Sequence, residues 1–175
     1  MNQTDAQIVR QVVLGNREAF GILVDRYHGR CLRVASHLLN DPDDAEDAVQ
    51  EAFVRAYRHL GSYRERDRFG AWLLRIVVNQ CRSRASYDRR WTSFDSANEP
   101  RIEHRSIDDE QRAELAHAMM QLAPEQREAI TLRFAEELSF AEMASVTGVG
   151  ISALKMRVQR ACTRLRTLLS EQINA

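Results

Sequence analysis

Apolar residues recur along this chain at steps of three and four positions, and no stretch alternates cleanly between apolar and polar residues. Because a helix turns once in about 3.6 residues, this spacing puts apolar side chains on one helical face, and the pattern predicts an all-α protein. The longest such segment runs from about Arg17 to Leu39 without a break in register. Its inward positions are Phe20, Leu23, Val24, Tyr27, Cys31, Val34, Ala35 and Leu38.

The first half of the chain contains four such segments. Helices are predicted at about 5–14, 17–39, 45–60 and 68–86, and turn residues follow each of the first three. Their register places Val13, Tyr57 and Trp72 among the inward positions. Four amphipathic helices in succession predict a first helical domain, residues 1–88.

The chain turns polar and loses its periodicity at 89–107, which predicts a flexible tether. Helices resume at about 108–122, with Leu115 inward, and at 124–135, where Pro124 suits a first helical position. Together with the segment that follows, they predict a second four-helix domain, residues 108–175.

The segment 139–169 has the pattern of a helix, a glycine turn and a second helix. Ser139 can cap the first helix with Glu142 reaching back, and Gly148 and Gly150 interrupt the chain. From 155 to 166 there are five basic residues and no acid, which is typical of a helix-turn-helix that lies against DNA. A solvated helix face without a partner is the alternative. The apolar positions of the second helix are Leu154, Val158, Ala161, Leu165 and Leu168.

The formal net charge is zero, with 25 basic and 25 acidic residues, so the overall charge favours no class of partner. The distribution of charge changes this picture. Between positions 41 and 51 there are six acids and no base, whereas between 53 and 90 there are ten arginines and three acids. Such segregation predicts two different partners that meet adjacent surfaces.

Several classes of protein are disfavoured by what the sequence lacks. No apolar run approaches the roughly 18 residues of a membrane span, and no secretory signal pattern is present, so a cytoplasmic protein is expected. Cys31, Cys81 and Cys162 are widely spaced and are interpreted as buried thiols, with no disulfide, metal site or cofactor. The five histidines lack ligand spacing and no phosphate-binding glycine motif occurs, so no catalytic residue is predicted.

Three blocks of sequence carry a family likeness that covers nearly the whole chain except the tether. They are AFGILVDRYHGRCLRVASHLLNDPDDAEDAVQEAFVRAYRHL, FGAWLLRIVVNQCRSRA and LAPEQREAITLRFAEELSFAEMASVTGVGISALKMRVQRA. The chain resembles an extracytoplasmic-function (ECF) sigma factor of the sigma-70 family. The resemblance implies a dissociable, non-catalytic subunit of bacterial RNA polymerase. Its first domain would be sigma region 2, which binds the core enzyme and opens the −10 element, and its second would be region 4, which reads the −35 element.

The resemblance implies that the acidic start of the third predicted helix contacts a coiled coil of the largest polymerase subunit. Asp44, Asp47, Gln50 and Glu51 are the residues that match this contact. They lie within about two helical turns, where carboxylates can meet basic side chains of a partner. Asp44 has an alternative interpretation, because acids at a helix start also act as caps or favour the helix dipole.

The resemblance places the contacts to the −10 element on the loop 61–68 and on the helix after it. Tyr63 and Asn79 are predicted to hold an extruded base by stacking and hydrogen bonding. The arginines expected to contact phosphates there are Arg66, Arg68, Arg75, Arg82 and Arg84.

In the second domain, the exposed face of the last helix matches family positions that enter the major groove at the −35 element. Ser152 and Arg157 are expected to contact phosphates. The residues expected to touch base edges are Lys155, Met156, Gln159 and Arg160.

The partners implied are bacterial core RNA polymerase and promoter DNA, and the resemblance leaves an anti-sigma protein open. The alternative function is a stand-alone helix-turn-helix transcriptional regulator, which would bind duplex DNA without polymerase. That alternative does not account for the acidic block beside the arginine-rich segment.

Overall fold

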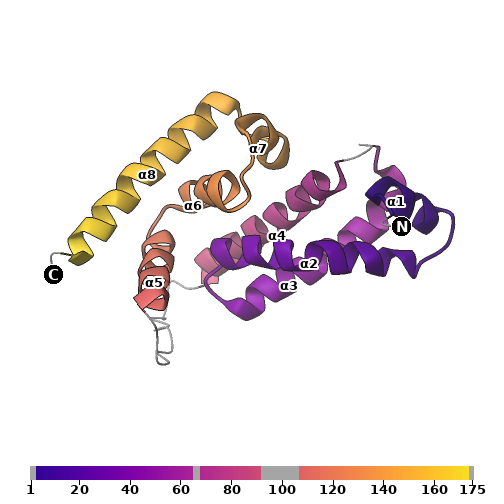
Figure 1. Ribbon diagram of the computed structural model, residues 1–175, viewed down its shortest axis with the longest axis horizontal. Coiled ribbons are helices and arrows are strands. Elements are labelled where there is room, and N and C mark those ends of the chain that lie inside the picture. Colours follow the sequence, from indigo (N-terminus) through magenta and orange to yellow (C-terminus); the bar gives the residue numbers. More distant parts are fainter. Residues whose placement is uncertain (1–2, 65–67, 92–106, 174–175) are drawn as a thin grey trace.

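The computed structural model describes residues 3–64, 68–91 and 107–173, and these ranges contain helices and no strand (Figure 1). The predicted all-α fold of two helical domains is confirmed. The helices of the first domain are α1 (Asp5–Val13), α2 (Ala19–Leu38), α3 (Pro42–His59) and α4 (Phe69–Trp91). Those of the second are α5 (Ile107–Met120), α6 (Pro124–Ile130), α7 (Phe140–Thr147) and α8 (Ile151–Ile173).

In the first domain, one boundary of α3 and one of α4 differ clearly from the prediction. Helix α3 begins at Pro42 rather than Ala45, because the side chain of Asp41 accepts hydrogen bonds from the backbone N–H groups of Asp43 (2.7 Å) and Asp44 (3.3 Å). Helix α4 continues to Trp91, past the predicted end near Ser86. Most of the predicted tether, 92–106, lies outside the described residues.

The first core lies between α1, α2, α3 and α4 and follows the predicted register at most positions. Leu23, Val49 and Leu73 are fully buried in it. Two expectations were wrong: Val13 is 56% exposed and Tyr57 is 38% exposed. Val13 is the last residue of α1, and Tyr57 places its ring edge on Phe20 at the margin of the core (5.2 Å between centroids).

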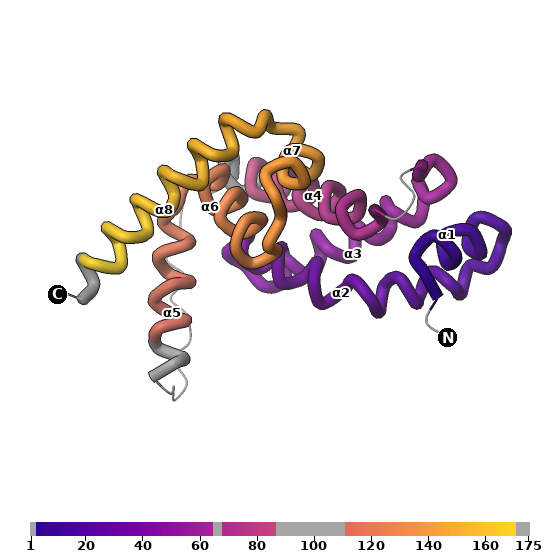
Figure 2. The backbone as a smooth tube through the Cα atoms, turned by 45° about the horizontal axis from the view of Figure 1, so that its top comes forward, coloured from indigo at the N-terminus to yellow at the C-terminus, as the bar shows by residue number. Residues whose placement is uncertain are grey.

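The second core joins the two domains. Met143, Leu154 and other residues of α5–α8 form it together with Val34 from α2 and with Leu74 and Val78 from α4. Figure 2 shows α7 lying beside α4, so the apolar layer runs across the boundary between the domains. Leu115, which was expected to face inward, is 48% exposed on α5.

The predicted helix 124–135 changes character before its end. Helix α6 is followed by a π-helical turn, Thr131–Ala135, and Glu137 then takes a positive φ of 53°. The chain turns here, which brings Glu136 towards α2 and sends the following segment into α7. A single periodic helix could not make this turn.

Candidate polymerase and nucleic-acid interfaces

The acidic residues of α3 lie on the side of the helix that faces away from the core. Ala45, Ala48 and Val49 are fully buried on the inward side, whereas Asp47 keeps 61% of its side chain exposed. The spacing of Asp44, Asp47 and Glu51 is three and four residues, which puts the three carboxylates on one helical face. Gln50 is also exposed. The structure therefore brings together the four residues predicted to contact polymerase. We call them the acidic face.

Each carboxylate of the acidic face has an arginine partner. Arg84 on α4 donates to Asp44 Oδ1 (2.8 Å) and to Asp47 Oδ2 (3.2 Å). Arg55 donates to Glu51 Oε1 at 3.0 Å within α3. These pairs are partly exposed to solvent, so each contributes little to stability and can be exchanged for a partner.

The role of Arg84 was missed by sequence analysis. It was predicted to contact a phosphate, and no local pattern connects it to Asp44, which lies 40 positions earlier. The cap of α3 is Asp41, so Asp44 is not the N-cap but a first-turn acid that binds Arg84.

Tyr63 belongs to an aromatic cluster at the start of α4. Its ring lies 5.0 Å from Trp72 and 5.8 Å from Phe69 between centroids, and its hydroxyl accepts a hydrogen bond from the backbone N–H of Arg68 (3.2 Å). Trp72 is half-buried and packs against the first core, as its register predicts. The Tyr63 ring is half-buried and is held in place by this cluster. Arg66 lies outside the described residues.

The polar face of α4 divides between solvent and the second domain. Asn79 is exposed, as a base-holding residue would have to be. Arg75 and Arg82, which were predicted to contact phosphates, point towards the second domain. Arg75 donates to the backbone carbonyl of Ser145 (2.8 Å), and Arg82 donates to both carboxylate oxygens of Glu128 (2.8 and 2.7 Å).

Helices α7 and α8 form the helix-turn-helix that the sequence predicts. Ser139 and Glu142 make a complete capping box. The hydroxyl and the backbone N–H of Ser139 both donate to the Glu142 carboxylate, which holds its pKa below the usual value. Gly148 ends α7 in the left-handed conformation, with φ of 72°. Leu154 and Ala161 then anchor α8 in the second core.

The exposed face of α8 carries five of the six residues predicted to meet the −35 element. They are Ser152, Lys155, Met156, Gln159 and Arg160. The Lys155 ammonium group lies over the ring of Phe140 on α7, 5.8 Å from its centroid. This cation–π contact restricts the rotamers that the lysine side chain can adopt. Arg157 is half-buried and is not part of this exposed face.

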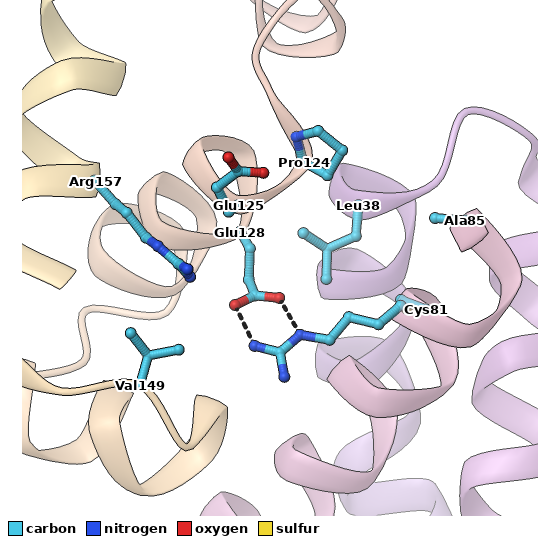
Figure 3. Close-up of a pocket in the computed structure, with 9 residues that line it drawn as sticks. Leu38, Cys81, Ala85, Pro124, Glu125, Glu128, Val149 and Arg157 are labelled. Carbon is cyan, nitrogen blue, oxygen red and sulfur yellow. Dashed lines mark hydrogen bonds and ion pairs between the residues drawn. The ribbon is translucent and has the colours of Figure 1, made fainter. Parts of the chain in front are cut away.

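Arg157 lines a pocket between the domains, with a volume of about 360 Å³. Leu38, Cys81 and Ala85 line it from the first domain, and Pro124, Glu125 and Val149 line it from the second. Figure 3 shows the side chain of Glu128 among them with its two hydrogen bonds, which come from Arg82. This hydrogen-bonded pair raises the pKa of Arg82, so the arginine stays charged. Sequence analysis gave no sign of Glu128, because its partner is contributed by another domain.

Within the described ranges, no helix has the length and apolar content needed to cross a bilayer. The same ranges contain no group of three or more His, Cys, Asp or Glu side chains placed to hold a metal ion. Cys31 and Cys81 are buried, and burial raises the pKa of each thiol to about 12, which keeps them protonated and unreactive. Cys162 is half-buried.

Comparison with known proteins adds an independent observation. Residues 23–92 match the family model described as Sigma-70 region 2, and residues 112–165 match the one described as Sigma-70, region 4. The chain is 31% identical to RNA polymerase sigma-H factor of Pseudomonas aeruginosa, over 91% of this chain and 90% of that protein. It is 32% identical to ECF RNA polymerase sigma factor SigM of Mycobacterium tuberculosis, over 95% and 85%.

Two solved structures share the fold. CnrH in complex with the cytosolic domain of CnrY superposes with a TM-score of 0.74 at 28% identity, covering 95% of this chain and 97% of that one. The sigma factor RpoE in complex with the anti-sigma factor NepR, from Bartonella quintana, gives a TM-score of 0.72 at 27% identity, covering 86% and 96%.

Proposed function

The chain belongs to the sigma-70 family as an ECF RNA polymerase sigma factor, and from this premise we propose how its residues divide the work of initiating transcription. The first domain, residues 1–88, binds core polymerase and opens the −10 element. The second, residues 108–175, reads the −35 element, and residues 89–107 connect the two. The chain supplies recognition, and the chemistry of RNA synthesis stays with the core enzyme in the cytoplasm.

The acidic face is the proposed contact to the coiled coil of the largest polymerase subunit. The observation that carries this proposal is that Asp47 and its neighbours are exposed and held by arginines of the same domain, rather than buried in the core. A basic partner can replace Arg84 and Arg55 at the carboxylates, because exposed ion pairs exchange at little cost. Charge complementarity then speeds the encounter and fixes its register.

At the −10 element, Tyr63 offers a ring for stacking and Asn79 offers an amide for hydrogen bonding to an extruded base. Stacking of a base on an aromatic ring is worth about 1–3 kcal/mol, which offsets much of the cost of unstacking it. The cationic residues assigned to the separating strands are Arg66, Arg68, Arg75 and Arg82.

At the −35 element, α8 enters the major groove. Its exposed row presents Lys155, Gln159 and Arg160 as hydrogen-bonding groups and Met156 as an apolar contact. Ser152 at the helix start and Arg157 are assigned to phosphates. Support comes from the cap, turn and buried face of α8, which together fix which side of the helix is exposed.

An anti-sigma protein is proposed as a further partner. RpoE of Bartonella quintana, a structural relative, is described in complex with the anti-sigma factor NepR, and the present chain shares its two-domain arrangement. Copurification from the native host tests this proposal, because an inhibitor would be recovered with the sigma factor in place of polymerase subunits.

The decisive experiment removes two carboxylates of the acidic face. In the variant Asp47→Ala/Glu51→Ala, we expect affinity for purified core polymerase to fall by about tenfold or more, since two charge-complementary contacts are lost. Run-off transcription from a cognate promoter should fall in parallel. Binding is measured by fluorescence anisotropy of the labelled sigma factor at fixed salt.

The control removes two exposed acids from another element, Glu18 and Asp25 near the start of α2 and within it. Glu18→Ala/Asp25→Ala makes the same change in net charge and should bind polymerase like the unchanged protein. Unchanged affinity in a folded Asp47→Ala/Glu51→Ala variant would overturn the proposed contact. A stand-alone regulator would instead bind duplex DNA tightly with no polymerase present.

A further inference from the structure

Tyr27 on α2 packs closely against the first residues of α4. Its ring lies 5.4 Å from the ring of Phe69 between centroids. A Cβ atom on Gly70 would lie 2.9 Å from Cε1 of Tyr27, so any other residue at this position would have to displace the ring. Glycine is less favourable than alanine inside a helix, because it loses more backbone entropy on folding. The glycine at position 70 therefore allows a close approach at some cost to the helix.

The first turn of α1 holds the hydroxyl end of Tyr27. The Tyr27 hydroxyl donates to Asp5 Oδ2, and Arg26 donates to Oδ1 of the same carboxylate. Asp5 follows directly on a complete capping box between Thr4 and Gln7, which fixes the start of α1. Burial and the hydrogen bond to Asp5 raise the pKa of Tyr27, so its hydroxyl stays protonated and remains a donor. The Tyr27 ring is therefore held by α1 as well as by α4.

Phe69 contacts both Tyr27 and the proposed base-holding residue Tyr63. It is 1% exposed, and its ring lies 5.8 Å from that of Tyr63 and 5.6 Å from that of Trp72 between centroids. Tyr63 lies near the start of the loop 61–68, and Phe69 follows its end directly. Because protein interiors are close-packed, a displaced ring in such a cluster displaces its neighbours. The position of Tyr27 therefore affects both ends of this loop.

We propose that Tyr27 is a positioning residue for promoter opening, because through Phe69 it fixes where the Tyr63 ring stands when a base is extruded. Asp5 and Gly70 act one step further away: Asp5 holds the hydroxyl of Tyr27, and Gly70 leaves room for its ring. Tyr27 itself touches no DNA. The proposal rests on the proposed function in one respect, the stacking role of Tyr63 at the −10 element.

The first test is Gly70→Ala in the full chain, which displaces the Tyr27 ring without removing an aromatic side chain. The near-ultraviolet circular dichroism of the free protein should change, because this signal depends on the packing of aromatic rings. Open complexes, measured by permanganate reactivity of unpaired thymines, should fall by about fivefold, the smallest contribution of one stacked base. Affinity for core polymerase should not change, because the acidic face lies in the first half of α3 and the cluster follows its end.

The matched control is Gly29→Ala. Gly29 lies two residues from Tyr27 on α2, and a Cβ atom there would meet open space. The control should keep the near-ultraviolet spectrum, open the promoter normally and melt at a slightly higher temperature, since alanine replaces a helical glycine. If Gly70→Ala keeps the spectrum of the unchanged protein, or opens the promoter as well as Gly29→Ala does, the positioning role is overturned.

A second variant, Tyr27→Phe, keeps the ring and removes the hydrogen bond to Asp5. It should also lower promoter opening with unchanged affinity for core polymerase. The double variant Gly70→Ala/Tyr27→Phe should open no worse than the more impaired single variant, because both changes act through one ring position. Normal opening by Tyr27→Phe would overturn the role of Asp5.

Tyr63→Ala separates this inference from the proposed function. It should itself open the promoter poorly, and Gly70→Ala should add no further loss in that background, because the ring that Tyr27 positions is absent. A further loss there would overturn the positioning role. If Tyr63→Ala opens poorly while Gly70→Ala opens normally, the proposed function stands and the positioning role fails. If Tyr63→Ala opens normally, the stacking role fails and the positioning role fails with it.

Discussion

Arg84 shows how one side chain can connect two proposed surfaces. It comes from α4, whose polar face is assigned to DNA, and it binds Asp44 and Asp47 of the acidic face. Sequence analysis identified both carboxylates because they form a dense local block. It could not identify the pairing, because contacts between distant positions depend on how helices pack rather than on local spacing.

Asn79 allows the proposed base contact to be tested apart from stability. Because its side chain is exposed, Asn79→Ala should change the free energy of unfolding by less than about 0.5 kcal/mol. Open-complex formation should fall by about tenfold if one hydrogen bond to the extruded base is lost. Permanganate reactivity of unpaired thymines measures promoter opening.

The control for this variant is Ser83→Ala, one turn further along α4 and also exposed. It should open the promoter normally. Equal opening by Asn79→Ala and Ser83→Ala would contradict the assignment of Asn79.

The capping box of α7 predicts a pH-dependent contribution to stability. Ser139→Ala should lower the free energy of unfolding by about 1 kcal/mol near neutral pH. The pKa of Glu142 in the folded protein is held below its usual 4.5. The ionised carboxylate therefore stabilises the folded state above pH 4.5, and this stabilisation is lost as the pH falls through the folded-state pKa. The difference in the free energy of unfolding between the unchanged protein and Ser139→Ala should therefore narrow as the pH falls below 4.5, as measured by urea unfolding at each pH. A constant difference across this range would contradict the capping role of Glu142.

At the scale of elements, periodicity and cap residues predicted the helices well because each helix buries one apolar face. The prediction failed where tertiary structure changes a helix that looks uniform in sequence. Residues 124–135 look like one helix, but the π-helical turn and Glu137 redirect the chain. Leu115 fits an inward register but is exposed, because only part of α5 is covered by its neighbours.

The turn between α7 and α8 provides a prediction about the orientation of the recognition helix. Gly148 has φ of 72°, so Gly148→Ala should destabilise the second domain by about 1–2 kcal/mol. Gly150 has no positive φ and open space around a Cβ atom, and it stands at the N-cap of α8, where alanine is a poorer cap than glycine. Gly150→Ala should therefore lower the free energy of unfolding by less than about 1 kcal/mol. Thermal unfolding of both variants checks this, and equal effects would show that the left-handed turn is not required.

At the scale of the whole molecule, the contact between the domains was beyond sequence analysis. Val34 was predicted to face inward, but periodicity reports that a face is buried without saying what covers it, and Leu74 and Val78 belong to no predicted apolar face. The arginines of α4 were assigned to DNA because the resemblance places the contacts to the −10 element on this helix. Their bonds to Ser145 and Glu128 depend on where the second domain docks.

Adjacent leucines on α4 test the shared apolar layer. Leu73 lies in the first core and Leu74 in the second, and both are almost completely buried. Each change to alanine should lower the free energy of unfolding by about 2–5 kcal/mol, but the two changes should loosen different parts of the protein. Leu74→Ala should raise hydrogen exchange in α6, α7 and α8, and Leu73→Ala should raise it in α1 and α3. The same exchange pattern in both variants would contradict a layer shared between the domains.

The shared layer also limits how freely parts of this protein can be interchanged. A chimera that joins the first domain to the DNA-reading half of a relative would keep Val34, Leu74 and Val78 facing a surface shaped for different side chains. Exchanging α5–α8 alone would leave a poorly packed contact between the two domains. Redirecting the protein to a new promoter by exchanging the whole second domain therefore requires changing these three positions as well.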